Sequence, residues 1–198
     1  MIKNCKVYGL EDSVKASKYP MAVDIDKCTS EITATTRKLA GCNTGEGHDN
    51  FLKGIIVQFD LTFSIKAWVE AERYHFFDFV SSQSTMHRVA KFDVSKQCNE
   101  YVEPGVIRIV KLLLERYNME PTAENYLRLL YNIPVGFRLT ARMTTNYQQL
   151  KTIYQQRKAH RLPEWREFCR WCETLPHSEF ITRKDGQNGE SDTDRADS

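Results

Sequence analysis

The fold is decided by the stretch Gly54-Ile55-Ile56-Val57-Gln58-Phe59-Asp60-Leu61-Thr62-Phe63-Ser64-Ile65. β-Branched and aromatic residues fill this stretch, and apolar side chains alternate with polar ones from Val57 to Phe63. Alternation with a period of two is typical of a strand that buries one of its faces. We therefore predict a strand over residues 54–65.

The spacing of apolar residues changes directly after this strand. Between Lys66 and Val80 they recur at intervals that suit a helix with a broad apolar face. Further helices are predicted over residues 105–117, 121–130, 144–160 and 163–175, and three of these have a proline at or next to their start, where its missing N–H costs nothing.

The part of the chain before the strand carries weaker signals. Residues 4–10 include Val7 and Tyr8 and indicate an edge strand. Residues 29–41 indicate a helix that ends at Gly41, because glycine readily adopts the left-handed conformation of a helix C-terminus.

Length and composition indicate one globular domain. The chain has 198 residues, of which 41% are hydrophobic and 27% charged, enough to build one substantial core. We predict a single α+β domain over residues 1–180, with a mixed or antiparallel sheet packed with several long helices. Residues 181–198 are polar and are predicted to be a disordered tail. The sequence shows neither a membrane-spanning apolar run nor a secretory signal, so a cytoplasmic location is expected.

Six cysteines are scattered along the chain, which is large enough to fold without disulfides, so reduced thiols are expected. The pair Cys169-x-x-Cys172 could suggest zinc or redox chemistry, but no second such pair or spaced histidine pair completes a four-ligand site. Both cysteines share helical spacing with Trp165 and Phe168, which favours core packing. No metal site is predicted.

The net charge of +2 is too small to indicate binding to duplex nucleic acid, which normally requires a concentrated basic face. A small ligand that carries a phosphate fits equally well. The chain contains neither the GxxxxGK[ST] nor the GxGxxG pattern, so nucleotide phosphates would not be held by a P-loop or a dinucleotide-binding turn.

One helical stripe ends in a cation that needs a partner. Asn146, Leu150, Ile153 and Arg157 are spaced four, three and four residues apart and share one face. An unpaired guanidinium beside apolar residues would be costly. Arg157 is therefore expected to pair either with a buried carboxylate or with a phosphate or ionised pyrimidine, for which its planar donor fork is suited.

Polar residues gather between Ser81 and Arg88, where Ser82, Gln83 and Ser84 precede His87 and Arg88. Such a cluster suits a phosphate or a sugar, although a solvated serine-rich loop would explain it as well. Arg73 lies upstream among apolar neighbours at helical spacing, so a structural ion pair is the alternative to a ligand contact there.

The histidines form no catalytic triad and no metal-binding pattern. His48 follows a glycine-containing loop, and His75 and His160 are predicted to lie on helices. A structural role is the simplest interpretation for each.

The order of these segments resembles the flavin-dependent thymidylate synthases. The strand ending Thr62-Phe63-Ser64-Ile65-Lys66-Ala67, followed by Arg73, resembles the strand and first active-site helix of that family. Asn146, Leu150 and Arg157, then Pro163-Glu164-Trp165-Arg166-Glu167, resemble its N-x-R-x-L helix, the arginine after it and its A-Q-W-E-I-like segment. The resemblance covers roughly residues 48–172.

This resemblance implies an activity and roles for particular residues. Arg157 would contact the pyrimidine of dUMP and act in catalysis, and Asn146 would lie beside the flavin. The segment from Ser81 to Arg88 falls where the family has its R-H-R-x-x-S-x-N-E-x-S-x-R-Y loop, which binds the dUMP phosphate and part of FAD. The implied substrate-binding set is Arg73, Ser82, Gln83, Ser84, Arg88 and Arg157, and the implied cofactor-binding set is His48, His75 and Asn146.

The resemblance also implies the partners of the reaction. Methylenetetrahydrofolate would donate the one-carbon unit, reduced FAD would supply the hydride, and NADPH would be a cosubstrate. Family members are homotetramers with active sites assembled between subunits, which would supply the partners that the cationic side chains lack within one chain.

The chain also departs from the family pattern. In an ungapped register the R-H-R motif becomes Phe77-Asp78-Phe79, which replaces cationic donors with two rings and an acid that would repel a diphosphate. Sliding the register instead sets Arg73-Tyr74-His75 against R-H-R and leaves the serines out of step. The arginine of N-x-R-x-L is Gln148. The arginine expected before the family's proline, which corresponds to Pro134, is absent at Leu130, with Arg128 as a nearby substitute. These changes favour the alternative of a flavin-free nucleotide-binding protein.

Overall fold

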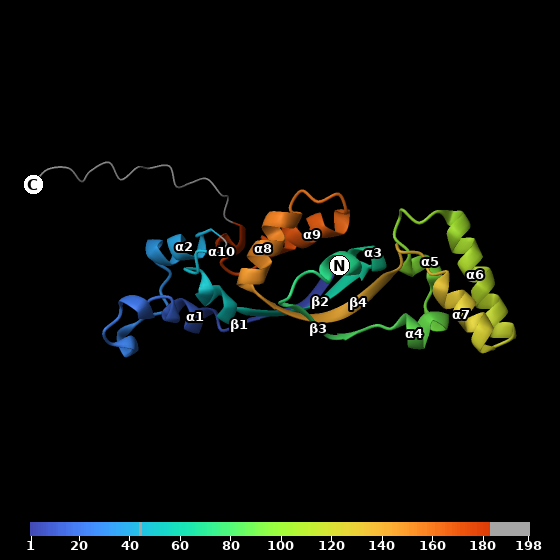
Figure 1. Ribbon diagram of the computed structural model, residues 1–198, viewed down its shortest axis with the longest axis horizontal. Helices are drawn as coiled ribbons and strands as arrows, with labels where there is room; N and C mark the ends of the chain where they lie inside the picture. The colour runs from blue at the N-terminus through green and yellow to red at the C-terminus, as the bar shows by residue number, and fades with distance from the viewer. Residues whose placement is uncertain (44, 183–198) are drawn as a thin grey trace, which may run out of the picture.

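The computed structural model describes residues 1–43 and 45–182, so most of the segment predicted as a tail lies outside the described residues. The molecule is elongated, with a central sheet and a group of helices at each end (Figure 1). One group follows the first strand, and the other is inserted between the third and fourth strands. The α+β class predicted from the sequence is confirmed.

Four antiparallel strands form one sheet in the order β1-β2-β4-β3. The two central strands, β2 and β4, pair without interruption from Ile56↔Asn146 to Ser64↔Arg138. The predicted strand is therefore confirmed as a central one, and the predicted edge strand is β1. The strands are β1 (Ile2–Tyr8), β2 (Ile56–Ser64), β3 (Phe77–Ser82) and β4 (Arg138–Asn146).

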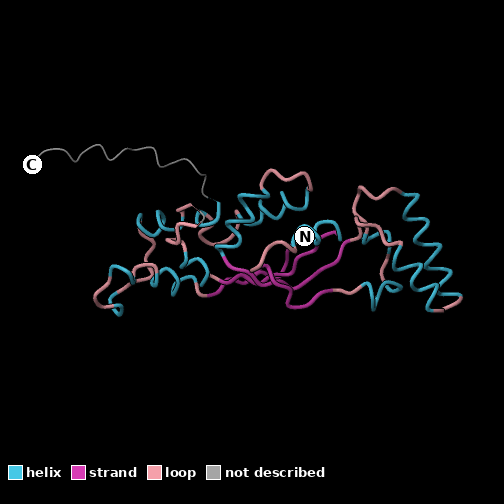
Figure 2. Tube along the Cα trace, in the orientation of Figure 1, coloured by secondary structure: helices cyan, strands magenta, loops and turns pink. Residues whose placement is uncertain are grey.

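Helices account for most of the remaining regular structure, and Figure 2 shows how they flank the strands. The α-helices are α1 (Leu10–Ala16), α2 (Ala34–Ala40), α3 (Ile65–Ala71), α4 (Thr85–Arg88), α5 (Val94–Gln97), α6 (Pro104–Met119), α7 (Ala123–Tyr131), α8 (Tyr147–Arg157), α9 (Pro163–Cys172) and α10 (Glu179–Thr182). Short 3-10 turns are η1 (Tyr19–Met21), η2 (Ile25–Lys27), η3 (Asn50–Gly54) and η4 (Val89–Lys91). None of the helices in the described ranges has the length and apolarity needed to cross a membrane.

The main core lies between one face of the sheet and helices α3, α8 and α9. Phe59 and Phe63 of β2 are fully buried and contact the rings of Trp165 and Phe168 on α9. A second, smaller core around Phe137 joins α6 and α7 to the end of β4. Apolar side chains on the alternating positions of β2 therefore define the buried face of the sheet.

The helix predicted over residues 66–80 is wrong in its second half. Helix α3 ends at Ala71, and Phe77–Ser82 forms the edge strand β3, which pairs with β4. Short apolar runs such as Phe76 to Val80 fit either structure by spacing alone. Their aromatic and β-branched composition suits a pleated surface, and the available partner strand decides the outcome.

The helix predicted from residue 144 starts later than expected, because the sequence analysis missed strand β4. Residues Arg138–Asn146 pair with β2 on one side and β3 on the other, so α8 begins only at Tyr147. Asn146 is the N-cap, and its side chain accepts a hydrogen bond from the Gln149 N–H. Threonines 140, 144 and 145 in this strand are the signal that helix spacing obscured.

The N-terminal boundaries also differ from expectation. Helix α2 begins at Ala34, where Thr33 forms a reciprocal capping box with Thr36. Gly41 ends this helix with φ −89° rather than in the left-handed conformation. A left-handed glycine occurs instead at Gly9, with φ +70°, where a Cβ would lie 2.6 Å from the Gly54 carbonyl oxygen.

A buried ion pair between Lys151 and Asp49 connects α8 to the N-terminal part of the chain. The Lys151 ammonium lies 2.8 Å from Asp49, and both side chains are 5% exposed. It also donates to the carbonyls of Ala40 and Cys42, and Gln148 donates to the other Asp49 oxygen. Every ammonium proton therefore has an acceptor, which a buried charge requires.

We expect Lys151→Met to lower the free energy of unfolding by about 3–5 kcal/mol, because it leaves the Asp49 carboxylate buried without its cation. Urea unfolding followed by circular dichroism measures the change. Lys111→Met, at an exposed position on α6, serves as the matched control and should change stability little. Equal stability of the two variants would contradict the structural role of the pair.

Candidate functional site

Arg157 lies at the end of α8, almost fully buried, and its guanidinium is directed at α3 and the turn after it. Its Nε donates to the Tyr74 hydroxyl at 2.7 Å, and its two terminal nitrogens contact a Glu70 carboxylate oxygen at 3.3 Å and the Glu70 carbonyl oxygen at 3.2 Å. The guanidinium carbon also lies 4.9 Å from the Trp165 ring centre. The carboxylate alternative predicted for Arg157 is therefore present in the structure.

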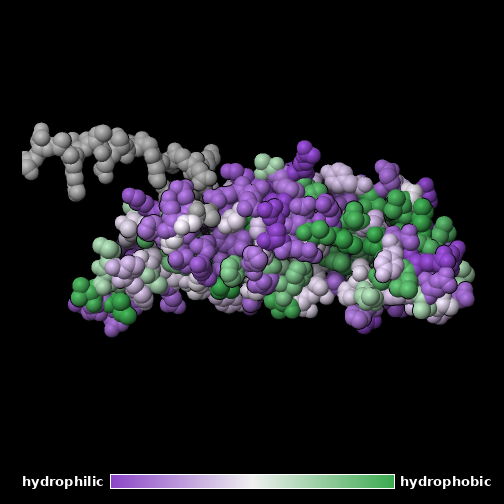
Figure 3. Space-filling model, viewed as in Figure 1, coloured by the Kyte–Doolittle hydropathy of each residue, from purple (hydrophilic) through white to green (hydrophobic). Residues whose placement is uncertain are grey.

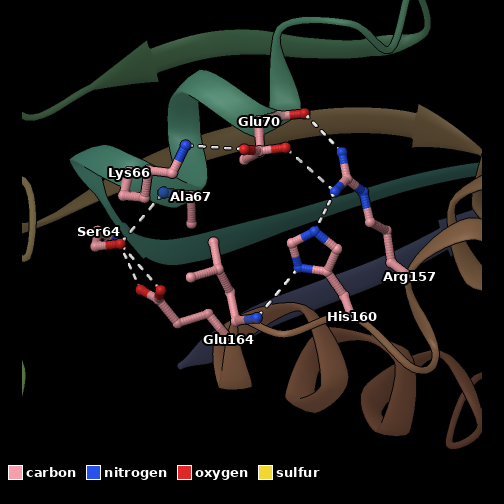
Figure 4. A network of polar contacts seen from close by, with 8 residues as sticks. Ser64, Lys66, Ala67, Glu70, Arg157, His160 and Glu164 are labelled. Carbon is pink, nitrogen blue, oxygen red and sulfur yellow. Dashed lines mark hydrogen bonds and ion pairs between the residues drawn. The ribbon is translucent and has the colours of Figure 1, made fainter. Parts of the chain in front are cut away.

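Figure 4 shows that Arg157 belongs to a chain of polar contacts that starts at Lys66. The Lys66 ammonium lies 2.9 Å from one oxygen of Glu70, and Arg157 contacts the other oxygen. The hydrogen bond and charge of Lys66, and then those of Arg157, lower the pKa of Glu70 below its usual value, although burial acts in the opposite direction. Glu70 is therefore a carboxylate held between two cations.

His160 completes this network on the far side of the Arg157 guanidinium. Its Nε2 lies 2.7 Å from Nη1 of Arg157, and the Leu162 N–H donates to its Nδ1 at 3.2 Å. Both ring nitrogens thus face donors, while a neutral imidazole can accept at only one of them. Burial, then the charge of Arg157, lowers the pKa of His160, so the imidazole is held neutral.

A second carboxylate joins the start of α9 to the start of α3. Glu164 accepts hydrogen bonds from the backbone N–H of Ser64 at 2.7 Å and from its hydroxyl at 2.9 Å (Figure 4). The same hydroxyl oxygen accepts from the Ala67 N–H and caps α3. Ser64 is thereby fixed at the junction of β2 and α3.

A cavity of about 160 Å³ lies beside the first turn of α8 and is lined in part by Gly45, Asp49, Phe76 and Gln149. Two of the residues predicted to contact a cofactor are next in sequence to residues that line this cavity, and the third is the N-cap of α8. His48 precedes Asp49, and His75 precedes Phe76. Asn146 caps α8 and is 9% exposed. The three candidates His48, His75 and Asn146 therefore come from segments that meet at one cavity.

The candidates Ser82, Gln83, Ser84 and Arg88 lie at the opposite end of β3, around the start of α4. Gln83 continues the sheet: its N–H donates to the Thr140 carbonyl, and its side-chain oxygen accepts from the Thr140 N–H. The hydroxyls of Ser82 and Ser84 and the exposed guanidinium of Arg88 have no hydrogen-bond partner among the described residues. These three donors are open to a ligand.

The structure therefore brings the candidates together as two separate groups. Arg73 and His75 lie in the turn that precedes β3, whereas Ser82 to Arg88 follow it. Arg73 is exposed, and it makes no ion pair within the described part of the chain. Its guanidinium carbon lies 5.9 Å from the Tyr74 ring centre. The expectation that Arg73 and His75 lie on a helix is wrong, since α3 ends at Ala71.

The motif positions in β3 carry no cation. Phe77 is buried in the core, whereas Asp78 and Phe79 are exposed. Phe79 packs against Trp68 with ring centres 4.8 Å apart. The Phe77-Asp78-Phe79 substitution therefore gives this end of the strand an apolar and acidic surface.

Cys169 and Cys172 pack in the protein interior, as their helical spacing with Trp165 and Phe168 predicted. All six cysteines are free thiols, and Cys169 and Cys172 are buried in the helix packing of α9. Burial raises the pKa of Cys169 to about 12 and that of Cys172 well above its ordinary value, so both stay protonated. No group of three or more potential metal ligands occurs within residues 1–43 and 45–182.

Several residues of the network were missed from the sequence. Glu70 stands four residues after Lys66, a spacing at which helical ion pairs form, and this signal could have found it. Tyr74 and Glu164 gave no such signal, because their contacts with Arg157 and Ser64 join segments 83 and 100 residues apart. His160 was predicted to lie on a helix, but it follows the short turn after the end of α8.

No protein-family model matches the chain. No curated protein matches it in sequence either. Two solved structures of the flavin-dependent thymidylate synthase ThyX from Helicobacter pylori, both with FAD and dUMP, align with TM-scores of 0.68 at 14% identity. One alignment covers 91% of this chain and 97% of the synthase, and the other 93% and 98%.

A third similar structure is the UMP/dUMP methylase PolB from Streptomyces cacaoi, bound with 5-Br dUMP. It aligns with a TM-score of 0.63 at 16% identity, over 88% of each chain. At these identities the likeness concerns the fold. This chain has the fold of ThyX and PolB along most of its length.

Proposed function

We propose that this chain binds the pyrimidine nucleotide dUMP and methylates its pyrimidine ring, as a thymidylate synthase-like enzyme. The observation that carries the proposal is the shared fold over about nine tenths of the chain, because the aligned structures hold dUMP or 5-Br dUMP. The open donors around the start of α4 support it, since a phosphate needs hydroxyl, amide or guanidinium partners.

The substrate-binding residues in this proposal belong to both groups. Ser82, Ser84 and Arg88 bind the nucleotide phosphate, and Gln83 positions them by fixing this segment to Thr140 of β4. Arg73 supplies a second exposed cation. A guanidinium and hydroxyls together match the several acceptor oxygens of a phosphate monoester.

Arg157 is assigned to the pyrimidine. Four of its five N–H donors are directed at Tyr74, Glu70 and His160, which leaves one on Nη2 for a ligand. Glu70 and Trp165 hold the guanidinium in place, so this donor is oriented before the nucleotide arrives. Preorganised donors of this kind stabilise charge that develops on a reacting ring.

The cofactor side of the proposal places FAD against His48, His75 and Asn146, with methylenetetrahydrofolate as the one-carbon donor and NADPH as the reductant. The cavity beside α8 measures about 160 Å³, below the roughly 300–1,000 Å³ of typical ligand pockets. One chain alone does not enclose a flavin nucleotide there. The proposal therefore includes a homotetramer, in the cytoplasm, whose subunits share each site.

A flavin-free nucleotide-binding protein is the second candidate function. Asp78 and two phenylalanines stand where the resembled family has cationic donors, and Asp78 is exposed on β3. A carboxylate at this position repels the diphosphate of FAD. This protein would bind dUMP without methylating it.

Tritium release from dUMP labelled at C5 tests the two candidates, because methylation at C5 replaces that hydrogen. The purified protein is incubated with labelled dUMP, methylenetetrahydrofolate and NADPH, with and without FAD. We expect tritium in water only with FAD present. No release, combined with a rise in Tm on adding dUMP, would favour the flavin-free candidate. Neither release nor stabilisation would contradict both.

Arg88→Ala is expected to weaken dUMP binding about tenfold or more, because a charged hydrogen bond to phosphate contributes about 1.5–3 kcal/mol. Isothermal titration calorimetry measures the affinity. Arg108→Ala, at an exposed position on α6, is the matched control and should bind dUMP as the unsubstituted protein does. If the two variants bind alike, Arg88 does not hold the phosphate.

Arg157→Ala is expected to cost about 2–5 kcal/mol in dUMP binding, since it removes a desolvated charged partner. The same change also removes contacts to Glu70 and Tyr74, so folding must be assessed separately. Tyr74→Phe separates the two effects, because it removes one structural contact of Arg157, the hydroxyl that accepts from Nε, and keeps the guanidinium itself. We expect it to lower the unfolding free energy by about 1 kcal/mol with affinity retained. Unchanged dUMP affinity in a folded Arg157→Ala protein would remove the assigned role.

A further inference from the structure

Two cavities adjoin each other where the end of β2 meets the segment between α5 and α6. Their volumes are about 330 and 400 Å³, within the range of pockets that hold small ligands. Both are lined by Asn99 and Tyr101 from that segment and by Pro163 and Glu164 at the start of α9. Figure 1 shows this segment beside α9. The two cavities therefore form one groove, and none of the residues assigned above to dUMP or FAD lines it.

The larger cavity has apolar walls. Its lining includes Val102, Val106, Pro134, Val135 and Leu162. Val106 and Val135 are 38% and 63% exposed, so apolar surface faces solvent there. In Figure 3 apolar surface gathers around α6 and the segment before it, on the right of the view. Such a cavity favours a ligand with an apolar group, because binding removes both apolar surfaces from water.

The smaller cavity is lined by a guanidinium that has no carboxylate partner. Arg138, at the start of β4, donates to three backbone carbonyls at the end of α5: from Nε to Gln97 at 3.3 Å, and from Nη2 to Lys96 at 3.0 Å and Cys98 at 3.3 Å. Both N–H groups of Nη1 are left without an acceptor in the part of the chain that the structure describes. Lys3 lines the same cavity, and its ammonium makes no ion pair within that part either. These donors suit an anionic group of a ligand.

Carboxylates line the groove as well, and most of them also lack partners. Glu100 and Glu167, in the smaller cavity, are exposed, and neither side chain makes a hydrogen bond or ion pair with a described residue. The same holds for Glu103 in the larger cavity. Glu164, by contrast, is bound by Ser64. The groove therefore presents cations and carboxylates that have not neutralised one another.

This mixture of charges disfavours a ligand of one sign. A phosphate near Arg138 would also face Glu100 and Glu167, and a simple cation near those carboxylates would also face Arg138 and Lys3. A ligand that carries one carboxylate and one ammonium satisfies both sets. The adjoining apolar cavity then accepts an apolar side chain of the same molecule.

We propose that this groove binds an α-amino acid with an apolar side chain, in its zwitterionic form. The carboxylate of the ligand contacts Nη1 of Arg138 and the Lys3 ammonium. The ammonium of the ligand contacts Glu100 and Glu167, and its side chain lies in the apolar cavity. Because the site shares no residue with the proposed nucleotide site, the inference does not depend on the proposed function.

The end of a peptide carries part of the same chemistry, and two analogues distinguish these sources. L-Leucinamide keeps the ammonium and lacks the carboxylate, as an N-terminal residue does. N-acetyl-L-leucine keeps the carboxylate and lacks the ammonium, as a C-terminal residue does. Glycine keeps both charges and lacks the apolar side chain.

Isothermal titration calorimetry of the full chain with L-leucine should show one saturable site. L-Leucinamide, N-acetyl-L-leucine and glycine should each bind at least tenfold more weakly, because each loses one of the three sets of contacts. No saturable binding of either L-leucine or L-phenylalanine would overturn the proposal. Binding of either leucine analogue as tight as that of L-leucine would also overturn it, and would assign the groove to a peptide end.

Glutamine substitutions test the ammonium contacts. Glu100→Gln combined with Glu167→Gln removes both charges and no contact within the described part of the protein, so folding should be retained. L-Leucine should bind this double variant at least fivefold more weakly, whereas N-acetyl-L-leucine should bind it as it binds the unsubstituted protein. Glu11→Gln combined with Glu115→Gln, at exposed positions on α1 and α6, is the matched control. If both double variants bind L-leucine alike, the proposal fails.

Arg138→Gln tests the carboxylate contact. We expect L-leucine to bind this variant at least tenfold more weakly and L-leucinamide to bind it unchanged, which also shows that the groove is intact without the bonds to α5. Undiminished L-leucine binding would overturn the assignment of Arg138. If L-leucinamide binding is lost as well, Lys3→Gln, which removes no contact within the described residues, is measured with the same two ligands and the same expected selectivity.

Discussion

The uninterrupted pairing of β2 with β4 is the constraint on which the rest of the structure depends. The two strands match residue for residue over nine positions, and a helix starts at each end of this ladder. Ser64 ends β2 and caps α3, and Asn146 ends β4 and caps α8. Because the strands are antiparallel, the two helices begin at opposite ends and run across the same face. Arg157 at the end of α8 therefore meets Glu70 near the end of α3.

How much of this could be predicted depends on the range of the interactions. Strand β2 was predictable because its alternation is a property of neighbouring residues, and α6 and α9 were predictable because their prolines and apolar spacing are local. Strands β3 and β4 were not. Residues such as Phe77 and Thr144 have spacings that fit helix and strand equally, and only the partner strand, whose paired residues lie 59 to 68 positions away (Ser82↔Ala141 to Phe77↔Thr145), selects between them.

The same distinction applies to the candidate site. Helical spacing alone identified Arg157 as a buried cation in need of a partner, and the structure supplies Glu70, Tyr74 and the ring of Trp165. Helical spacing gave no indication of Tyr74 as a partner of Arg157. Tyr74 lies in the turn after α3, and the position of this turn depends on where α3 ends. Nor could it show that Arg73 and Arg88 lie at opposite ends of one strand, because it placed the residues from Arg73 to Val80 on a helix.

The buried charged side chains described above mostly connect segments that are distant in sequence. Lys151 joins α8 to the loop after α2, and Arg157 joins α8 to α3. All three Lys151 donors and four of the five Arg157 donors are directed at protein groups, which limits how far either side chain can turn toward a ligand. The exposed candidate donors Arg73, Ser82 and Arg88 lie instead near the ends of a strand and in turns, where many binding residues of proteins are found.

The contact between Glu164 and Ser64 connects the first turns of helices α9 and α3. Since one carboxylate on α9 accepts from both the backbone and the hydroxyl of the residue that caps α3, neither helix can fray at its first turn without releasing the other. Amide protons in these two turns should exchange with solvent at similar rates, as one cooperative unit, although 100 residues separate them in the chain. The sheet junction would then open as a single event, linking the N-terminal half of the protein to its C-terminal half.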